Sequence, residues 1–156
     1  MFVWIVPRDA EESPYDVKEG TMKTLIPWLW TAGALQLMII AANFVVPRKL
    51  CCRENLARVS PMIRTVFVVH WIYIVLVLGI FTSLSFWFAP ELAGASRLGR
   101  YLSAAIAVFW LLRVPIQLFF YDPEIRKQNR FGDVIFLLAF SYLGVVFGVA
   151  VLGVLR

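Results

Sequence analysis

A charged side chain interrupts the apolar stretch "VFWLLRVPIQLFFYD", in which Arg113 precedes Gln117 by four residues. This spacing predicts that both side chains lie on one face of a helix. An arginine inside a membrane costs at least about 2.5 kcal/mol, and such residues usually face a partner or a ligand. Because no acid lies within any apolar segment, we expect the partner to be Asp122 or Asp133 at the rim, a neutral group, another subunit or an anionic ligand.

Two local features influence where Arg113 points. Helical side chains lean toward the amino terminus of their helix, which would direct Arg113 toward the membrane centre. Pro115 cannot donate a hydrogen bond to the carbonyl of Leu111, so that oxygen is a further candidate partner. Snorkelling of the guanidinium to the nearer interface is the alternative.

His70 is the only histidine in the chain, and it also lies in an apolar segment. A neutral imidazole can be an axial metal ligand to haem or chlorophyll, with Arg113 pairing a propionate or carbonyl and Trp110 lining the ring. Without a second histidine, only a five-coordinate, mixed-ligand or subunit-bridging site would suit a haem. A hydrogen bond inside the bundle is the simpler alternative, and we expect no zinc site within one protomer.

The polar side chains of the apolar segments can be compared by their depth in the membrane, because a helix rises about 1.5 Å per residue. His70 lies roughly 9 Å in from Arg64, and Arg113 roughly 12 Å in from Tyr121, by the same rise. A quinone or a lipid head group is a further candidate ligand, and a structural polar network is the alternative. The predicted ligand-binding layer comprises Arg113, Gln117, His70, Asn43, Ser141, Tyr142 and Trp110.

The elements that must position these residues are four apolar segments. The chain has 156 residues, of which 61% are hydrophobic and 16% charged, so it is far more apolar than a soluble domain. About 20 helical residues cross a bilayer core, and the segments 25–46, 66–88, 98–121 and 134–155 each reach that length. The sequence therefore predicts an all-α integral membrane protein, a four-transmembrane-helix bundle with short loops that occupies residues 25–156.

Residues 1–24 are expected to form an external acidic N-terminal tail. The tail contains five acids against three basic residues, together with Pro7, Pro14 and Gly20. It shows no sustained helical or strand period, so we predict an irregular segment that ends before the first membrane helix. Its first six residues, "MFVWIV", lack a basic leader and are expected to lie at the membrane surface.

Basic residues are concentrated in the loops 47–65 and 122–133, which are therefore predicted to be cytoplasmic, with both termini outside. The aromatic belt agrees, because Trp28, Trp30, Trp87 and Tyr101 fall at the predicted outer ends of the helices. We expect a bacterial inner membrane. The net charge of +5 is explained by these topology signals, so no nucleic-acid partner is predicted.

Both basic loops have recognisable local patterns. The 47–65 loop is predicted to contain a short amphipathic surface segment, and Cys51 and Cys52 within it are inert, lipid-modified or at a subunit contact. In the other loop, Asp122 and Pro123 could begin a short surface helix that Gly132 would end.

Gly144 and Gly148 have the small-xxx-small spacing that lets helices approach closely. Packing inside the bundle and contact between copies of the chain are both compatible with it.

No nucleophile–base pair, carboxylate pair or metal cluster stands out, so an enzyme is not the favoured interpretation. We predict a small non-enzymatic accessory or assembly subunit of a larger membrane complex, which could hold a lipid, a porphyrin or a quinone in the polar layer. One alternative is a membrane enzyme or binding protein for an apolar substrate with an anionic head. A dimeric transporter ranks third, because its membrane segments contain no acid for proton coupling.

Overall fold

The computed structural model describes residues 14–49, 57–94, 96–120 and 130–153, and all its regular elements are helices. Four of these helices are long and apolar enough to span a membrane. The chain is therefore an integral membrane protein with a four-helix bundle, as the sequence predicts. The helices are α1 (Pro14–Lys49), α3 (Pro61–Trp87), the short α4 (Ala89–Ala93), α5 (Arg97–Phe120) and α7 (Arg130–Gly153).

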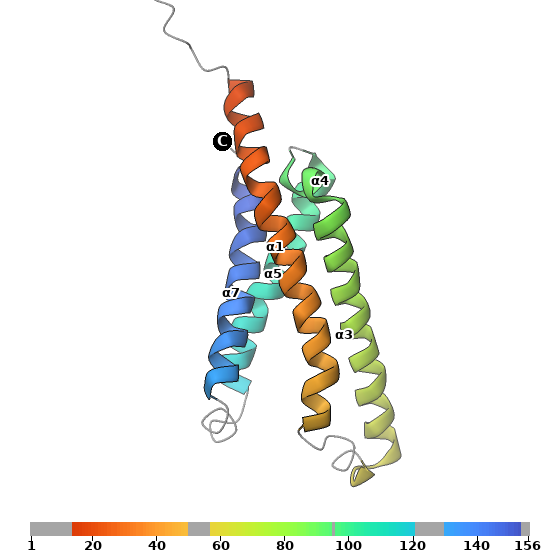
Figure 1. The fold of residues 1–156 in the computed structure, drawn as a ribbon. Coiled ribbons are helices and arrows are strands. Elements are labelled where there is room, and N and C mark those ends of the chain that lie inside the picture. Colours follow the sequence, from red (N-terminus) through yellow and green to blue (C-terminus); the bar gives the residue numbers. More distant parts are fainter. Residues whose placement is uncertain (1–13, 50–56, 95, 121–129, 154–156) are drawn as a thin grey trace, which may run out of the picture.

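The long helices form two antiparallel pairs, α1 with α3 and α5 with α7, joined mainly through contact of α1 with α7. The terminus end of the bundle is defined by α4 and the start of α1, and the loop end by Lys49, Pro61, Phe120 and Arg130. The two pairs meet toward the terminus end and diverge toward the loop end (Figure 1).

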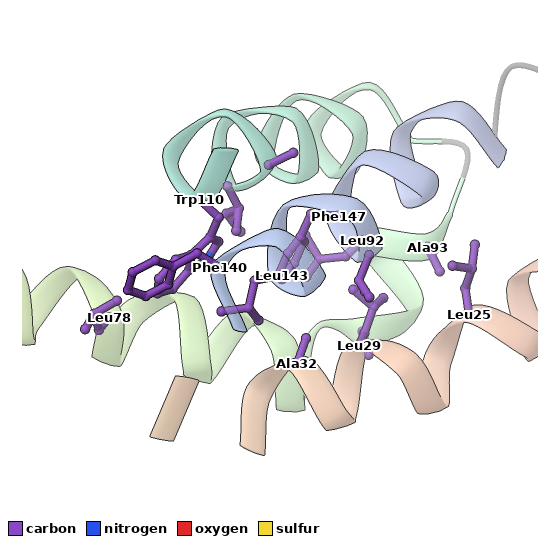
Figure 2. Close-up of a cluster of buried hydrophobic side chains, with 14 of the residues drawn as sticks. Leu25, Leu29, Ala32, Leu78, Leu92, Ala93, Trp110, Phe140, Leu143 and Phe147 are labelled. Carbon is purple, nitrogen blue, oxygen red and sulfur yellow. The ribbon is translucent and has the colours of Figure 1, made fainter. Parts of the chain in front are cut away.

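The hydrophobic core lies in the terminus-end half, where α1, α4, α5 and α7 meet (Figure 2). Leu29, Leu92 and Phe147 are almost fully buried there. In α3 the buried residues are Leu78, Thr82 and Ser85, all in its second half, whereas each of residues 61–70 is exposed. Side-chain packing therefore joins the pairs near the terminus end, whereas the loop-end half of α3 is exposed.

Helix α4, which the sequence analysis did not predict, closes the terminus end between α3 and α5. Its apolar side chains Ala89, Leu92 and Ala93 are buried. Ser103 Oγ in α5 donates a hydrogen bond to the carbonyl oxygen of Leu92 at 3.1 Å. A Cβ at Gly99 would collide with the carbonyl oxygen of Glu91, so glycine permits this close approach.

The irregular tail predicted through residue 24 is wrong for residues 14–24, because α1 begins at Pro14. Once the membrane helix has formed, each further residue gains a hydrogen bond without a new nucleation cost. Proline is compatible with a first helical turn, and the glycine at position 20 costs only about 1 kcal/mol relative to alanine. The predicted surface segment of residues 1–6 lies outside the described residues.

Helix boundaries next to the loops also differ from the prediction. Helix α3 begins at Pro61 after Ser60, so the last residues of the predicted 47–65 loop are helical. Gly132 lies in the first turn of α7 and does not end a helix there. The following apolar segment offsets the modest helical cost of this glycine. Cys51, Cys52 and the predicted cap at Asp122 and Pro123 lie outside the described residues.

Candidate functional site

A polar contact near the loop end of the α5–α7 pair joins Gln117 to Asp133. Gln117 is 5% exposed, and its Nε2 donates to Asp133 Oδ1 at 2.8 Å and to the Asp133 carbonyl oxygen at 3.2 Å. Asp133 is in the first turn of α7, where a negative charge is favoured by the helix dipole. Asp133, a predicted candidate partner of Arg113, is thus also bonded to Gln117.

Arg113 lies one turn nearer the membrane centre on the same side of α5 and is half-buried. Its guanidinium carbon is 5.7 Å from the centroid of the Phe140 ring, within reach of a cation–π interaction. Phe140 stacks on Trp110, with ring centroids 5.4 Å apart and planes inclined by 24°. Arg113, Trp110 and Phe140 therefore form an aromatic and cationic cluster between α5 and α7.

Trp110 adds a polar group that the cluster does not satisfy. The indole ring is 2% exposed, and its Nε1 has no hydrogen-bond acceptor within the described residues. Gln36 Oε1 in α1 lies 3.4 Å from Ser85 Oγ, whose single proton goes to the carbonyl oxygen of Phe81 at 2.8 Å. The buried Gln36 amide is therefore satisfied when its nitrogen, rather than its oxygen, faces the Ser85 hydroxyl. A buried donor without an acceptor costs about 1–3 kcal/mol, so the Trp110 indole marks the mid-depth of the bundle as a place where an acceptor would be stabilised.

His70 lies on the side of α3 that faces α5. At about 100° per residue, it is only about 20° around the helix from Phe81. Phe81 packs edge-on against Phe109 of α5, with ring centroids 5.1 Å apart. From this contact, His70 lies about 16 Å toward the loop end and Arg113 about 6 Å, by the helical rise. Both residues lie on the sides where the two helix pairs diverge, but their depths along the bundle differ by about 10 Å.

Three other members of the predicted polar layer form hydrogen bonds to groups other than Arg113, and a ligand-binding role for the layer stays a prediction. Asn43 Nδ2 donates to the carbonyl of Ile39 at 2.9 Å, and Ser141 Oγ donates to the carbonyl of Leu137 at 2.8 Å. Such bonds to the preceding helical turn satisfy a short polar side chain without any partner helix. Tyr142 is hydrogen-bonded to Thr31 Oγ1 at 2.6 Å, on the terminus side of the Arg113 cluster.

The structure thus brings together Arg113, Gln117 and Trp110, whereas His70 faces the same side at a different depth. The sequence analysis missed Phe140 and the amide of Gln36. Gln36 could have been noticed as the only amide between Trp30 and Asn43 in the first apolar segment. Phe140 carries no signal of its own, because phenylalanine is ordinary in a membrane helix.

The Arg113 guanidinium is a candidate contact for an anionic group, whereas the Trp110 and Phe140 rings beside it are 2% and 5% exposed and are covered by the bundle. Among the described residues, no group of three His, Cys, Asp or Glu side chains could hold a metal ion. The axial-ligand role of His70 stays a prediction. Comparison with known proteins adds no assignment, because no family model, curated protein or solved structure matches the chain.

Proposed function

We propose that this protein is a small non-enzymatic accessory subunit of a larger membrane complex, and that helices of its partners cover α3. The observation that carries the proposal is the burial of the four spans. In the most apolar 18-residue window of α3, 6% of the residues are buried inside the chain, against 33%, 28% and 39% in the spans of α1, α5 and α7. A helix that buries so little within its own chain has a surface available for other helices.

The position of His70 supports a protein partner over lipid alone. His70 is exposed and lies within the span Pro61–Trp87. Ionisable residues in membrane helices nearly always face protein or a water-filled cavity. A partner helix with a hydrogen-bond acceptor near this depth would give the imidazole such surroundings.

Site-specific photo-crosslinking in the native membrane tests the proposal. A photoreactive residue in place of Val69, 45% exposed on the loop-end half of α3, is expected to form adducts with other polypeptides. Phe131 on α7, 83% exposed, provides a control position that is likewise near the loop end. If Val69 gives only lipid adducts and the chain is isolated from its membrane as a monomer, the accessory-subunit proposal is wrong.

A second candidate function is binding of an apolar molecule with an anionic head, such as a lipid, a quinone or a porphyrin. The observation that favours it is the Arg113 guanidinium beside Phe140 and the unsatisfied Trp110 indole donor. An anionic head would pair with Arg113, and the apolar body would stay in the lipid phase beside α5. If the ligand reacts there, an enzyme follows, with His70 or Tyr142 as candidate proton donors.

Native mass spectrometry of the protein drawn gently from its own membrane tests this second function. We expect a stable mass increment that Arg113→Ala removes and that Arg97→Ala, at the exposed terminus end of α5, retains. An increment that survives Arg113→Ala would place the ligand elsewhere and contradict this function.

The orientation that we propose places both termini outside and the basic loops in the cytoplasm of a bacterium. Arg58, Arg64 and Arg130 support it, because all three lie at the loop end. Trp28, Trp87 and Tyr101 lie in the terminus-end half and are 57%, 75% and 72% exposed, as an aromatic belt requires.

A further inference from the structure

A groove of about 360 Å³ lies between α1 and α7 in the terminus-end half, away from Arg113 and His70. It is lined almost wholly by apolar groups, from Thr24, Leu25, Trp28, Tyr142, Val145, Val146 and Val149. We propose that this groove binds one acyl chain of an anionic phospholipid. The proposal is independent of the partner that covers α3.

The groove has a floor and walls. Leu25 and Val146 are 7% and 6% exposed and form its floor, whereas Val145 and Val149 are exposed along one wall. The floor and walls therefore present hydrocarbon on both sides of a guest chain. From Tyr142 to Val149, the lining runs about 10 Å along α7 by the helical rise.

The polar groups next to the groove already satisfy one another. Thr31 Oγ1 is 2.8 Å from the carbonyl oxygen of Trp28, to which it donates, and 2.6 Å from the Tyr142 hydroxyl oxygen. Because the threonine hydroxyl has a single proton, the Tyr142 hydroxyl must be the donor in the second bond. Neither hydroxyl requires a ligand, so the groove selects an apolar guest along this length.

The surroundings of the groove identify that guest as a lipid chain. Both walls belong to the candidate membrane spans Lys23–Val45 and Arg130–Leu152, so hydrocarbon is the medium that the groove meets. A single acyl chain fits, and a pocket volume above 300 Å³ is sufficient for small-molecule binding.

The rim of the groove points to an anionic head group. Trp28 is 57% exposed, and tryptophan prefers the head-group level of a bilayer. Lys23 is exposed and directly precedes Thr24 at the open end. A cation at this level attracts a lipid phosphate electrostatically, which favours anionic over zwitterionic lipids.

Native mass spectrometry in detergent, with phosphatidylglycerol or phosphatidylcholine added, tests the proposal. Val145→Phe with Val149→Phe fills the groove and is expected to reduce the phosphatidylglycerol-bound fraction at least fivefold. The matched control, Val134→Phe with Ile135→Phe, changes exposed α7 residues outside the groove and should bind normally. Lys23→Gln should weaken phosphatidylglycerol binding and leave phosphatidylcholine binding unchanged.

Equal lipid binding by the groove-filled and control variants would overturn the proposal, as would a change in oligomeric state caused only by filling the groove. If the filled variant does not fold, chain-brominated phosphatidylglycerol gives a second test on the otherwise unchanged protein. At one lipid per protein in detergent, we expect Trp28→Phe to remove most of the quenchable tryptophan fluorescence and Trp30→Phe to remove little. Equal losses from these two substitutions would contradict a chain bound in the groove.

Discussion

Gly144 and Gly148 are equivalent in the sequence motif, but their surroundings in the fold differ. A Cβ at Gly144 would lie 2.6 Å from Leu111 Cδ2, whereas a Cβ at Gly148 would meet nothing within 4 Å. The close approach of α5 and α7 therefore depends on Gly144. Packing inside the bundle explains this glycine, and contact between copies stays a prediction for Gly148.

Gly144→Ala should destabilise the protein by about 1–3 kcal/mol, because the added methyl group overpacks a filled interface. Unfolding of the purified protein in mixed detergent micelles would measure the change. Gly148→Ala is the control and should leave stability unchanged or slightly raised, since alanine reduces the conformational freedom of the unfolded chain. Similar losses in both variants would show that Leu111 moves aside easily.

The Thr31–Tyr142 hydrogen bond is a second residue-scale link, and it joins α1 to α7. A double-mutant cycle with Thr31→Val and Tyr142→Phe should give a coupling free energy of about 0.6 kcal/mol, the average for hydrogen bonds between membrane helices. The same unfolding assay would measure it. A coupling near zero would mean that the two hydroxyls find equally good partners when separated.

At the scale of the helices, aromatic contact at mid-depth joins α3 to α5. Phe81 of α3 meets Phe109 of α5, and Phe109 in turn meets Trp110 edge-on at 5.3 Å between centroids. Toward the loop end the residues of α3 become exposed. The mid-depth contact is therefore one of the contacts that can set the separation of the two pairs at that end.

Phe81→Ala should increase or broaden the distance between the pairs, because it removes the ring that holds α3 against α5. Pulsed electron paramagnetic resonance with spin labels at Thr65 and Ile116, after replacement of Cys51 and Cys52 by serine, would measure that distance. Phe119→Ala is the control, since its ring is 81% exposed at the loop end. An unchanged distance distribution in Phe81→Ala would show that other contacts fix the separation.

For the whole molecule, the helix order places residues 57–60 at one membrane face and Ser96, beside α4, at the other. In a chain whose native cysteines are replaced, we expect Ser96→Cys to react with a membrane-impermeant maleimide in intact cells. Ser60→Cys should react only after permeabilisation, because the basic loops are proposed to be cytoplasmic. The reverse pattern would invert the proposed orientation and leave the fold intact.

The sequence by itself determined the class of the protein and its membrane helices. Four apolar segments of spanning length require helices, because a backbone in lipid must satisfy its own hydrogen bonds. The basic residues near 47–65 and 122–133 predicted that both these loops lie at one end, and the helix order agrees. Errors occurred where the chain leaves the membrane, as at residues 14–24 and Gly132, since water satisfies either a helix or a loop there.

Tertiary structure alone decided which polar residues meet. Depth along each helix placed His70 and Arg113 in one layer, but the Phe81–Phe109 contact shifts the helices so that these residues differ in depth by about 10 Å. Tyr142 belongs with Thr31, and Asn43 bonds its own helix. The hydropathy of a helix is a one-dimensional property, whereas its rotation and axial offset follow from side-chain packing against its neighbours. For that reason the candidate residues can be identified from the sequence. That the Arg113 cluster and the groove between α1 and α7 are separate sites follows only from the packing of the helices.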